Sequence, residues 1–213
     1  GKMGRFFLNS LIITLPTVFG TLFLSSLAGY SLAMHRFKLN LLVFAMFIAG
    51  NFVPYQILMI PVRNISIEMG VYNTHIGLII FHIAFQTGFC TFFLRNFIKE
   101  LPFELIEAAR ADGATEWLIY RKIILPLIIP ALAALGVLEF TFIWNDYFWA
   151  LVLTQGDTVK PITVGLDVLR GQWTTSWNLV SAGSVVAALP PVIMFFILQK
   201  QFIQGLTFGA VKG

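Results

Sequence analysis

The sequence predicts an all-α protein, a polytopic bundle of membrane-spanning helices. Of its 213 residues, 58% are hydrophobic and only 11% are charged, and the mean hydropathy is +0.84. A soluble domain carries about 25% charged residues, so this chain could not cover a soluble fold with polar surface. The same shortage of charge argues against a disordered or nucleic-acid-binding protein. Cys90 is the single cysteine, which excludes an intrachain disulfide and an all-cysteine metal site.

Five stretches are long and apolar enough to span a bilayer. A hydrocarbon core about 30 Å thick needs roughly 20 apolar residues in a helix. We expect spans at about residues 6–33, 39–60, 74–97, 123–153 and 179–198. The runs are continuously apolar, whereas barrel strands alternate lipid-facing and lumen-facing residues, so helices are favoured. Residues 1–213 are therefore expected to form a single transmembrane domain.

The basic residues predict the side of the membrane on which each connection lies. The first connection (34–38), the third (95–122) and the tail (199–213) contain nine of the 14 Lys and Arg residues. Cytoplasmic loops carry an excess of Lys and Arg, so these segments and the C-terminus are expected in the cytoplasm. Five spans then place Lys2 and Arg5 outside, and one further span upstream would remove that conflict.

The third connection contains a segment, residues 99–124, that predicts a helix-turn-helix. Pro102 suits the first turn of a helix, and Gly113 suits a left-handed stop at its end. Thr115 can cap a second short helix that runs into the fourth span. An amphipathic helix that only rests on lipid headgroups is the alternative interpretation of this pattern.

This segment resembles the EAA signature of permeases in binding-protein-dependent ABC importers. Nine residues separate Gly113 from Ile123, as in the signature, and the matching residues are Glu107, Ala108, Ala109, Asp112, Gly113, Ile123, Leu125 and Pro126. Among these permeases, the chain is similar to the carbohydrate-uptake branch, in particular to its smaller, maltose-type subunit. The similarity lies in residues 36–37, 144–146 and 205–213.

The resemblance implies a sugar permease, with an oligosaccharide as the expected cargo. It is not expected to be an enzyme or to bind a cofactor, and the sequence contains no Gly-x-x-x-x-Gly-Lys-Ser/Thr segment for ATP. The implied partners are a homologous second permease subunit, two ATPase subunits that bind ATP and Mg, an extracytoplasmic sugar-binding protein and the lipid bilayer. The implied location is a bacterial or archaeal cytoplasmic (inner) membrane.

The resemblance also assigns roles to particular residues. The residues expected to couple transport to the ATPase are Glu107, Ala108, Ala109, Asp112 and Gly113. Gly209 and Lys212 in the tail are expected to contact the ATPase subunits. The outer loop at about residues 154–178, with Lys160 and Trp173, is expected to dock the binding protein. A lid without a partner is the alternative for that loop.

Polar side chains inside the spans are candidates for the transport pathway, because burying them in lipid is costly. His82 and Gln86 lie one helical turn apart in the third span, and a hydrogen-bonded pair between helices is their alternative role. Glu139 and Asp146 are seven residues apart and are expected on one face of the fourth span. Asn145 lies beside Asp146, where the alternative is a position at the membrane interface.

Two other functions are weighed against the importer. An ion-coupled secondary transporter would use Glu139 and Asp146 as coupling carboxylates, and it predicts an internal repeat, which we do not detect in the sequence. An intramembrane serine protease would use Ser184 and His82, but the sequence around Ser184 does not specify the geometry of a nucleophile.

Overall fold

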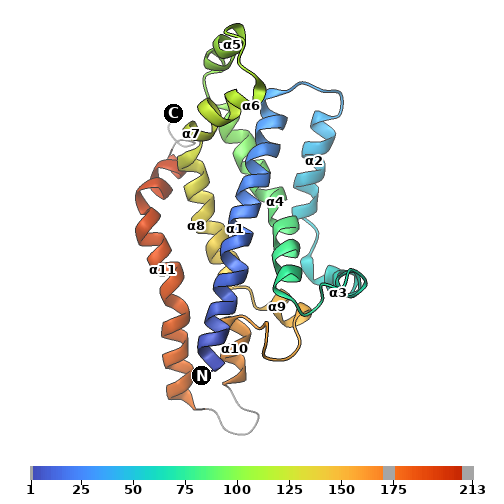
Figure 1. Cartoon of the computed structure of the whole chain (residues 1–213), viewed down its shortest axis with the longest axis vertical. Helices are drawn as coiled ribbons and strands as arrows, with labels where there is room; N and C mark the ends of the chain where they lie inside the picture. The colour runs from blue at the N-terminus through green and yellow to red at the C-terminus, as the bar shows by residue number, and fades with distance from the viewer. Residues whose placement is uncertain (1, 170–175, 208–213) are drawn as a thin grey trace. The chain divides into compact units, whose positions relative to one another are not determined.

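The computed structural model describes residues 2–169 and 176–207, and every regular element in these ranges is a helix (Figure 1). In chain order they are α1 (Lys2–Met34), α2 (Asn40–Asn51), the 3₁₀ helix η1 (Tyr55–Leu58), α3 (Met59–Glu68), α4 (His75–Lys99), α5 (Phe103–Ala111), α6 (Glu116–Ile119), the π-helix η2 (Tyr120–Ile124), α7 (Leu125–Leu127), α8 (Ile129–Trp144), α9 (Phe148–Leu153), α10 (Ile162–Val168) and α11 (Trp177–Thr207). The predicted all-α class is confirmed.

Three helices in the described ranges are each long and apolar enough to cross a bilayer: α1, α4 and α11. Two bent pairs pass the same test together, α2 with η1–α3 and α6–α7 with α8. If each pair is one span, the structure has up to the five spans that the sequence predicts. The third span agrees with α4 within two residues, whereas α11 continues nine residues beyond the predicted end at residue 198.

The prediction of one continuous helix over residues 39–60 is wrong. Helix α2 ends at Asn51, and a short 3₁₀ helix begins only after Pro54. Proline has no N–H to continue a helix and its ring restricts the preceding residue, here Val53. Residues 59–68, expected to divide between this span and a loop, form the separate helix α3.

The prediction of one continuous helix over residues 123–153 is also wrong. Pro126 and Pro130 cannot donate backbone hydrogen bonds, and the helix is π-helical before the first of them and interrupted at Ile128 between the two. A second interruption follows Trp144, where α8 ends and α9 begins only at Phe148. Glu139 therefore lies in α8, while Asp146 lies outside it, and the two do not share a helix face.

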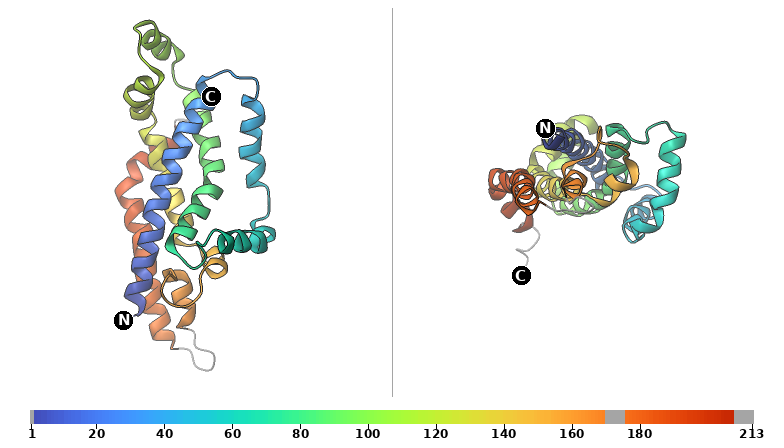
Figure 2. Two further views of the ribbon diagram at one scale, coloured as in Figure 1. Left: turned by 45° about the vertical axis from the view of Figure 1, so that its right-hand side comes forward. Right: turned by 90° about the horizontal axis from the view of Figure 1, so that it is seen from below.

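By internal packing the chain divides into two compact units. Unit 1 contains the described residues of 1–20, 53–84 and 137–197. Its core includes Trp144, which stacks on Phe140 with ring centroids 5.6 Å apart and meets the edge of Phe7 at 5.4 Å. The indole N–H of Trp144 donates to the carbonyl of Ala187 at 2.8 Å, which attaches α8 to α11. Figure 2 shows α3 and α9 of this unit side by side.

Unit 2 contains the described residues of 21–52, 85–136 and 198–207. In it α2 packs beside α4 through the stacked rings of Phe44 and Phe92 (Figure 1). Cys90 is fully buried in its core, where it packs as a small apolar side chain. The buried core residues of this unit come from α1, α4, α5, α6, η2 and α8, and one of them directly precedes α8. They are Tyr30, Cys90, Leu94, Ile98, Ile106, Ile119, Tyr120, Ile124, Ile128, Ala131 and Leu135.

Gly77 offers a test of the packing in unit 1. A Cβ at this position would collide with the carbonyl oxygen of Val71, a backbone atom that cannot rotate away. We expect Gly77→Ala to destabilise the protein by about 1–3 kcal/mol, as overpacking does elsewhere. Thermal unfolding in detergent measures this. Gly50→Ala is the matched control, because a Cβ at Gly50 in α2 meets nothing within 4 Å. Equal loss of stability in both variants would contradict this account.

Candidate functional site

Helix α5 presents most of its surface to its surroundings and is held by one buried side chain. It begins at Phe103, directly after Pro102, and Glu104 provides an acidic group in its first turn. Ile106 is 1% exposed and belongs to the core of unit 2. Glu107 and Ala108 are exposed, whereas Ala109 is half-buried. The EAA residues thus lie on a helix that is anchored on one side and open to a partner on the other.

The turn after α5 has the geometry that the sequence predicts. Gly113 has φ +80°, a left-handed conformation that glycine adopts without strain. The N–H of Gly113 donates to the carbonyl of Arg110 at 3.0 Å, and the N–H of Ala114 to that of Ala109, also at 3.0 Å. These bonds pair carbonyls at the helix end that would otherwise lack partners. Asp112 is exposed beside the turn, where its own N–H donates to the carbonyl of Ala108.

Thr115 caps the second helix, also as predicted. Its hydroxyl accepts a hydrogen bond from the N–H of Leu118 at 3.3 Å, and α6 begins at the next residue. Residues 99–124 therefore form the expected helix-turn-helix, with its two short helices separated by the Gly113 turn.

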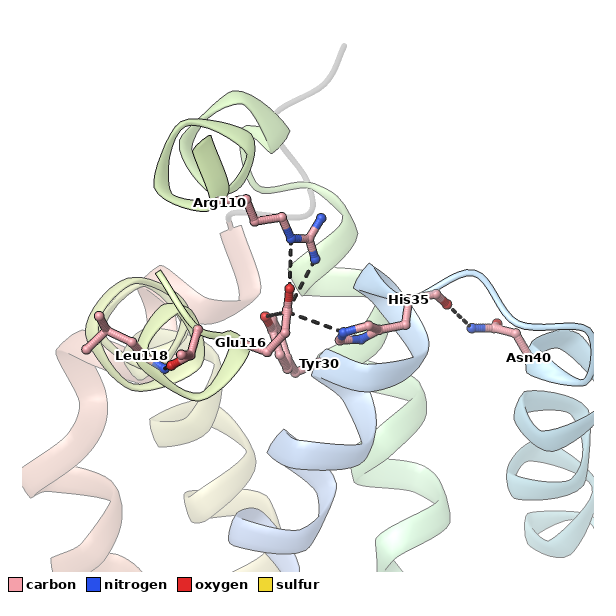
Figure 3. Close-up of polar contacts among 7 residues, drawn as sticks. Tyr30, His35, Asn40, Arg110, Glu116 and Leu118 are labelled. Atoms are coloured by element: carbon pink, nitrogen blue, oxygen red, sulfur yellow. Dashed lines mark hydrogen bonds and ion pairs between the residues drawn. The ribbon is translucent and has the colours of Figure 1, made fainter. Parts of the chain in front are cut away.

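Glu116 is the centre of a polar cluster in unit 2 that the sequence analysis missed (Figure 3). Its carboxylate accepts hydrogen bonds from the Tyr30 hydroxyl at 2.6 Å and from Arg110 Nε at 2.8 Å. The ring of His35 places Nε2 3.3 Å from the same carboxylate. The hydrogen bond between Arg110 and Glu116 raises the pKa of Arg110 above its ordinary value and lowers the pKa of Glu116 below its own, as expected of an ion pair. No sequence motif links residues 30 and 35 to residue 116.

A second polar cluster lies in unit 1 around Asp146. Its carboxylate accepts from the backbone N–H groups of Trp149 at 3.3 Å and Ala150 at 2.9 Å, so it caps the start of α9. The buried His82 places Nε2 3.5 Å from Asp146 Oδ2. These two candidates and the hydroxyl-bearing Ser10 and Thr14 line a cavity of about 10 Å³, which is close to the least space that can hold one water molecule.

The other pathway candidates are not among the residues that line this cavity. Glu139 is fully buried in α8, and Asn145 is exposed with its amide donating to the carbonyl of Thr141 at 2.9 Å. Gln86 is half-buried and belongs to unit 2. The structure thus joins His82 with Asp146, a pair that the sequence analysis did not predict.

The candidates in the outer loop and the tail are described only in part. Lys160 Nζ lies 3.6 Å from Asp157, which also accepts a hydrogen bond from Lys2 at 2.8 Å. Trp173, Gly209 and Lys212 lie outside the described residues.

The chain is similar in sequence to a known protein family and to several of its members. Residues 22–208 match the family model described as binding-protein-dependent transport system inner membrane component. The chain is 37% identical over 213 residues to the melibiose/raffinose/stachyose import permease protein of Bacillus subtilis, and 36% identical over 213 residues to the arabinooligosaccharides transport system permease protein of Halalkalibacterium halodurans. These alignments cover 100% of this chain and 77% and 76% of the two relatives, respectively.

Solved structures of a bacterial ABC transporter that imports alginate have the same fold. One reaches a TM-score of 0.79 at 22% identity, with 95% of this chain and 75% of that chain covered. Another, in complex with a periplasmic protein bound to an alginate pentasaccharide, reaches 0.76 at 19% identity, with 91% and 76% covered. The matched family model spans most of the chain, and both relatives exceed 30% identity over its whole length. The chain therefore belongs to the family of binding-protein-dependent transport system inner membrane components.

Proposed function

We propose that the chain is a transmembrane permease subunit of an ATP-driven sugar importer. The cargo is an oligosaccharide delivered by an extracytoplasmic binding protein, and separate ATPase subunits hydrolyse ATP with Mg. Two relatives named for oligosaccharide transport, each aligned over the whole chain, support the class of cargo. The observation that carries the proposal is the exposed helix-turn-helix with the EAA residues at its centre.

The surface of residues 99–124 exposes apolar side chains that are better suited to contact a protein than to face water. Phe103, Leu105 and Trp117 are 45%, 49% and 57% exposed, an unusual amount of apolar surface for a short connection. Glu107 is exposed on the same segment and supplies a carboxylate for a charge-assisted hydrogen bond to a basic group of the partner. A groove on an ATPase subunit would receive α5, and closure of two ATPase subunits around ATP would move it. The pathway would then switch between external and cytoplasmic openings by a rigid-body transition.

The remaining surfaces accommodate the other partners. Only 6% of the most apolar window of α11 is buried, so this helix is available to lipid and to a homologous second permease subunit. The excess of basic residues favours a cytoplasmic position for residues 99–124 and the C-terminus, where Gly209 and Lys212 of the tail would meet the ATPase. Lys160 and Trp173 on the outer side would face the binding protein.

The transport pathway would involve the polar candidates of the spans. His82 and Asp146 form one pair, and Gln86, Glu139 and Asn145 provide further hydrogen-bonding groups. Sugar hydroxyls are recognised by such groups in a few defined positions, so a small number of side chains is enough to select the cargo.

Co-purification tests the assignment of the coupling segment. From membranes that express the whole transporter, the wild-type chain should elute in mild detergent with ATPase subunits and a homologous permease. Glu107→Ala should reduce the recovered ATPase about tenfold, because a hydrogen bond to a charged group contributes about 1.5–3 kcal/mol. Glu68→Ala is the control, since Glu68 is an exposed carboxylate at the end of α3. A wild-type chain that elutes alone, without ATPase activity, would overturn the proposal.

Gly113 tests whether the turn acts as a pivot. A Cβ at Gly113 meets nothing within 4 Å, so Gly113→Val acts only through the positive φ, at about 1–3 kcal/mol. We expect uptake to fall while membrane insertion and expression stay intact. Gly70→Val is the matched control, because Gly70 has φ +69° and equally open surroundings in unit 1. Wild-type uptake by Gly113→Val at equal expression would contradict the coupling role.

The source of energy separates the importer from an ion-coupled transporter that uses Glu139 and Asp146. In vesicles that contain ATP, with the binding protein and labelled raffinose or stachyose outside, uptake should require ATP and persist after ionophores collapse the ion gradients. Uptake that continues without ATP and stops with the ionophores would favour the ion-coupled transporter.

A further inference from the structure

Two hydrogen-bonded pairs join α1 to the residues that follow the Gly113 turn, all within unit 2. The Tyr30 hydroxyl donates to Glu116 Oε2 at 2.6 Å, and Ser26 Oγ lies 2.7 Å from Tyr120 Oη. Residues 26 and 30 are one helical turn apart on α1, and residues 116 and 120 are one turn apart on α6–η2. Helix α1 and the α6–η2 segment therefore run antiparallel where they meet. If one slid past the other by one residue, both hydrogen-bonded pairs would be lost.

Three of the four side chains that set this register between α1 and α6–η2 are buried, so breaking their contacts is costly. Ser26, Tyr30 and Tyr120 are 2%, 5% and 3% exposed, and the two tyrosine rings pack with centroids 5.5 Å apart. The Ser26 hydroxyl keeps the carbonyl of Phe23 as a partner at 2.8 Å, so the cost of separation falls on the buried hydroxyls of Tyr30 and Tyr120, which water would not reach.

Glu116 differs from the other three residues because it also holds the turn itself. Arg110 precedes Gly113 and Glu116 follows it, and the hydrogen bond of 2.8 Å between them closes the turn from both sides (Figure 3). Through Arg110 this carboxylate contacts α5, through Tyr30 it contacts α1, and through His35 it contacts the chain just beyond α1. One side chain thus connects the helix expected to meet the ATPase with the end of the first span.

We propose that Glu116 is a positioning residue that transmits movement of α5 to α1, with the Ser26–Tyr120 pair keeping the register. The inference rests on the proposed function, since it needs an ATPase to move α5. It adds a further route for the movement, because the chain itself connects α5 to α4 on one side and to α6, η2 and α8 on the other, but not to α1. A side-chain contact of α1 with residues 116 and 120 lets the same displacement act on α1 as well.

Hydrogen–deuterium exchange of the full transporter complex tests this directly. In the wild type, ATP should change the exchange of α5 and of α1 residues 26–34 together. In Tyr30→Phe, which removes the donor, the change in α5 should remain and the change in α1 should be lost. In Glu116→Gln, which removes the charge that pairs with Arg110, the change in α1 should be reduced. Both substitutions preserve side-chain shape, so the complex should still assemble. Sugar moved per ATP hydrolysed should fall about fivefold or more, the lower end of couplings between distant sites.

Two controls separate transmission from general stability. Glu68→Gln removes a carboxylate and Tyr72→Phe removes a hydroxyl in unit 1, and both should leave the exchange pattern and the uptake per ATP unchanged. The double variant Tyr30→Phe/Glu116→Gln should be no more impaired than the worse single variant, because the contacts of Glu116 with Arg110 and with Tyr30 lie one after the other on the same route from α5 to α1.

Each contrary result has a distinct meaning. Loss of the ATPase from the wild-type complex would overturn the proposed function. An assembled wild-type complex in which ATP changes α5 but not α1 would overturn only the present inference. So would a normal response of α1 in both Glu116→Gln and Tyr30→Phe.

Discussion

In hydrocarbon, a backbone N–H or C=O has no water to bind, and the other features of this chain follow from that constraint. It favours long uninterrupted helices, and α1, α4 and α11 meet it with 33, 25 and 31 residues. It also makes each interruption informative, because the groups released there need partners from the protein. The interruptions lie at Pro54, between Pro126 and Pro130, and at Asp146. At Asp146 the side chain itself supplies the missing acceptor for two N–H groups of α9.

The same constraint explains the hydroxyl groups inside the helices. Thr17 donates to the carbonyl of Ile13 at 2.6 Å, Thr141 to that of Val137 at 2.8 Å, and Ser184 to that of Val180 at 2.8 Å. Each uses an acceptor one turn back in its own helix, which needs no neighbouring helix. Ser26 and Tyr30 differ, since they also bind residues outside α1. Ser184, whose hydroxyl donates to its own helix, provides no support for the protease alternative.

The sequence predicted the elements whose causes are local. The Gly113 turn, the Thr115 cap and the length of α4 depend on residues a few positions apart, and each is confirmed. The bends in the two bent spans were missed because hydropathy counts Pro54, Pro126 and Pro130 as small interruptions, whereas a proline cannot donate the backbone hydrogen bond that continues a helix. The Glu116 cluster was missed for a different reason. Tyr30 and Glu116 are 86 residues apart, and only the packing of α1 against α6 brings them together.

The contacts of Asp146 also bear on the choice between an importer and an ion-coupled transporter. A carboxylate that carries a proton or a sodium ion needs oxygen lone pairs that it can expose and exchange. In Asp146, Oδ1 accepts from the N–H of Trp149, and Oδ2 accepts from that of Ala150 and lies 3.5 Å from His82. Both oxygens are thus engaged at the start of a helix, where the dipole also favours a negative charge. Releasing them would leave the first turn of α9 without its cap, so the geometry favours a fixed structural carboxylate. Glu116 has a different character, because its side chain is 44% exposed and its partners come from three different segments: α5, α1 and the residue that follows α1. Of the two carboxylates, Glu116 therefore fits a part in a conformational cycle, and that cycle would begin at the coupling segment and not at an ion site in the spans.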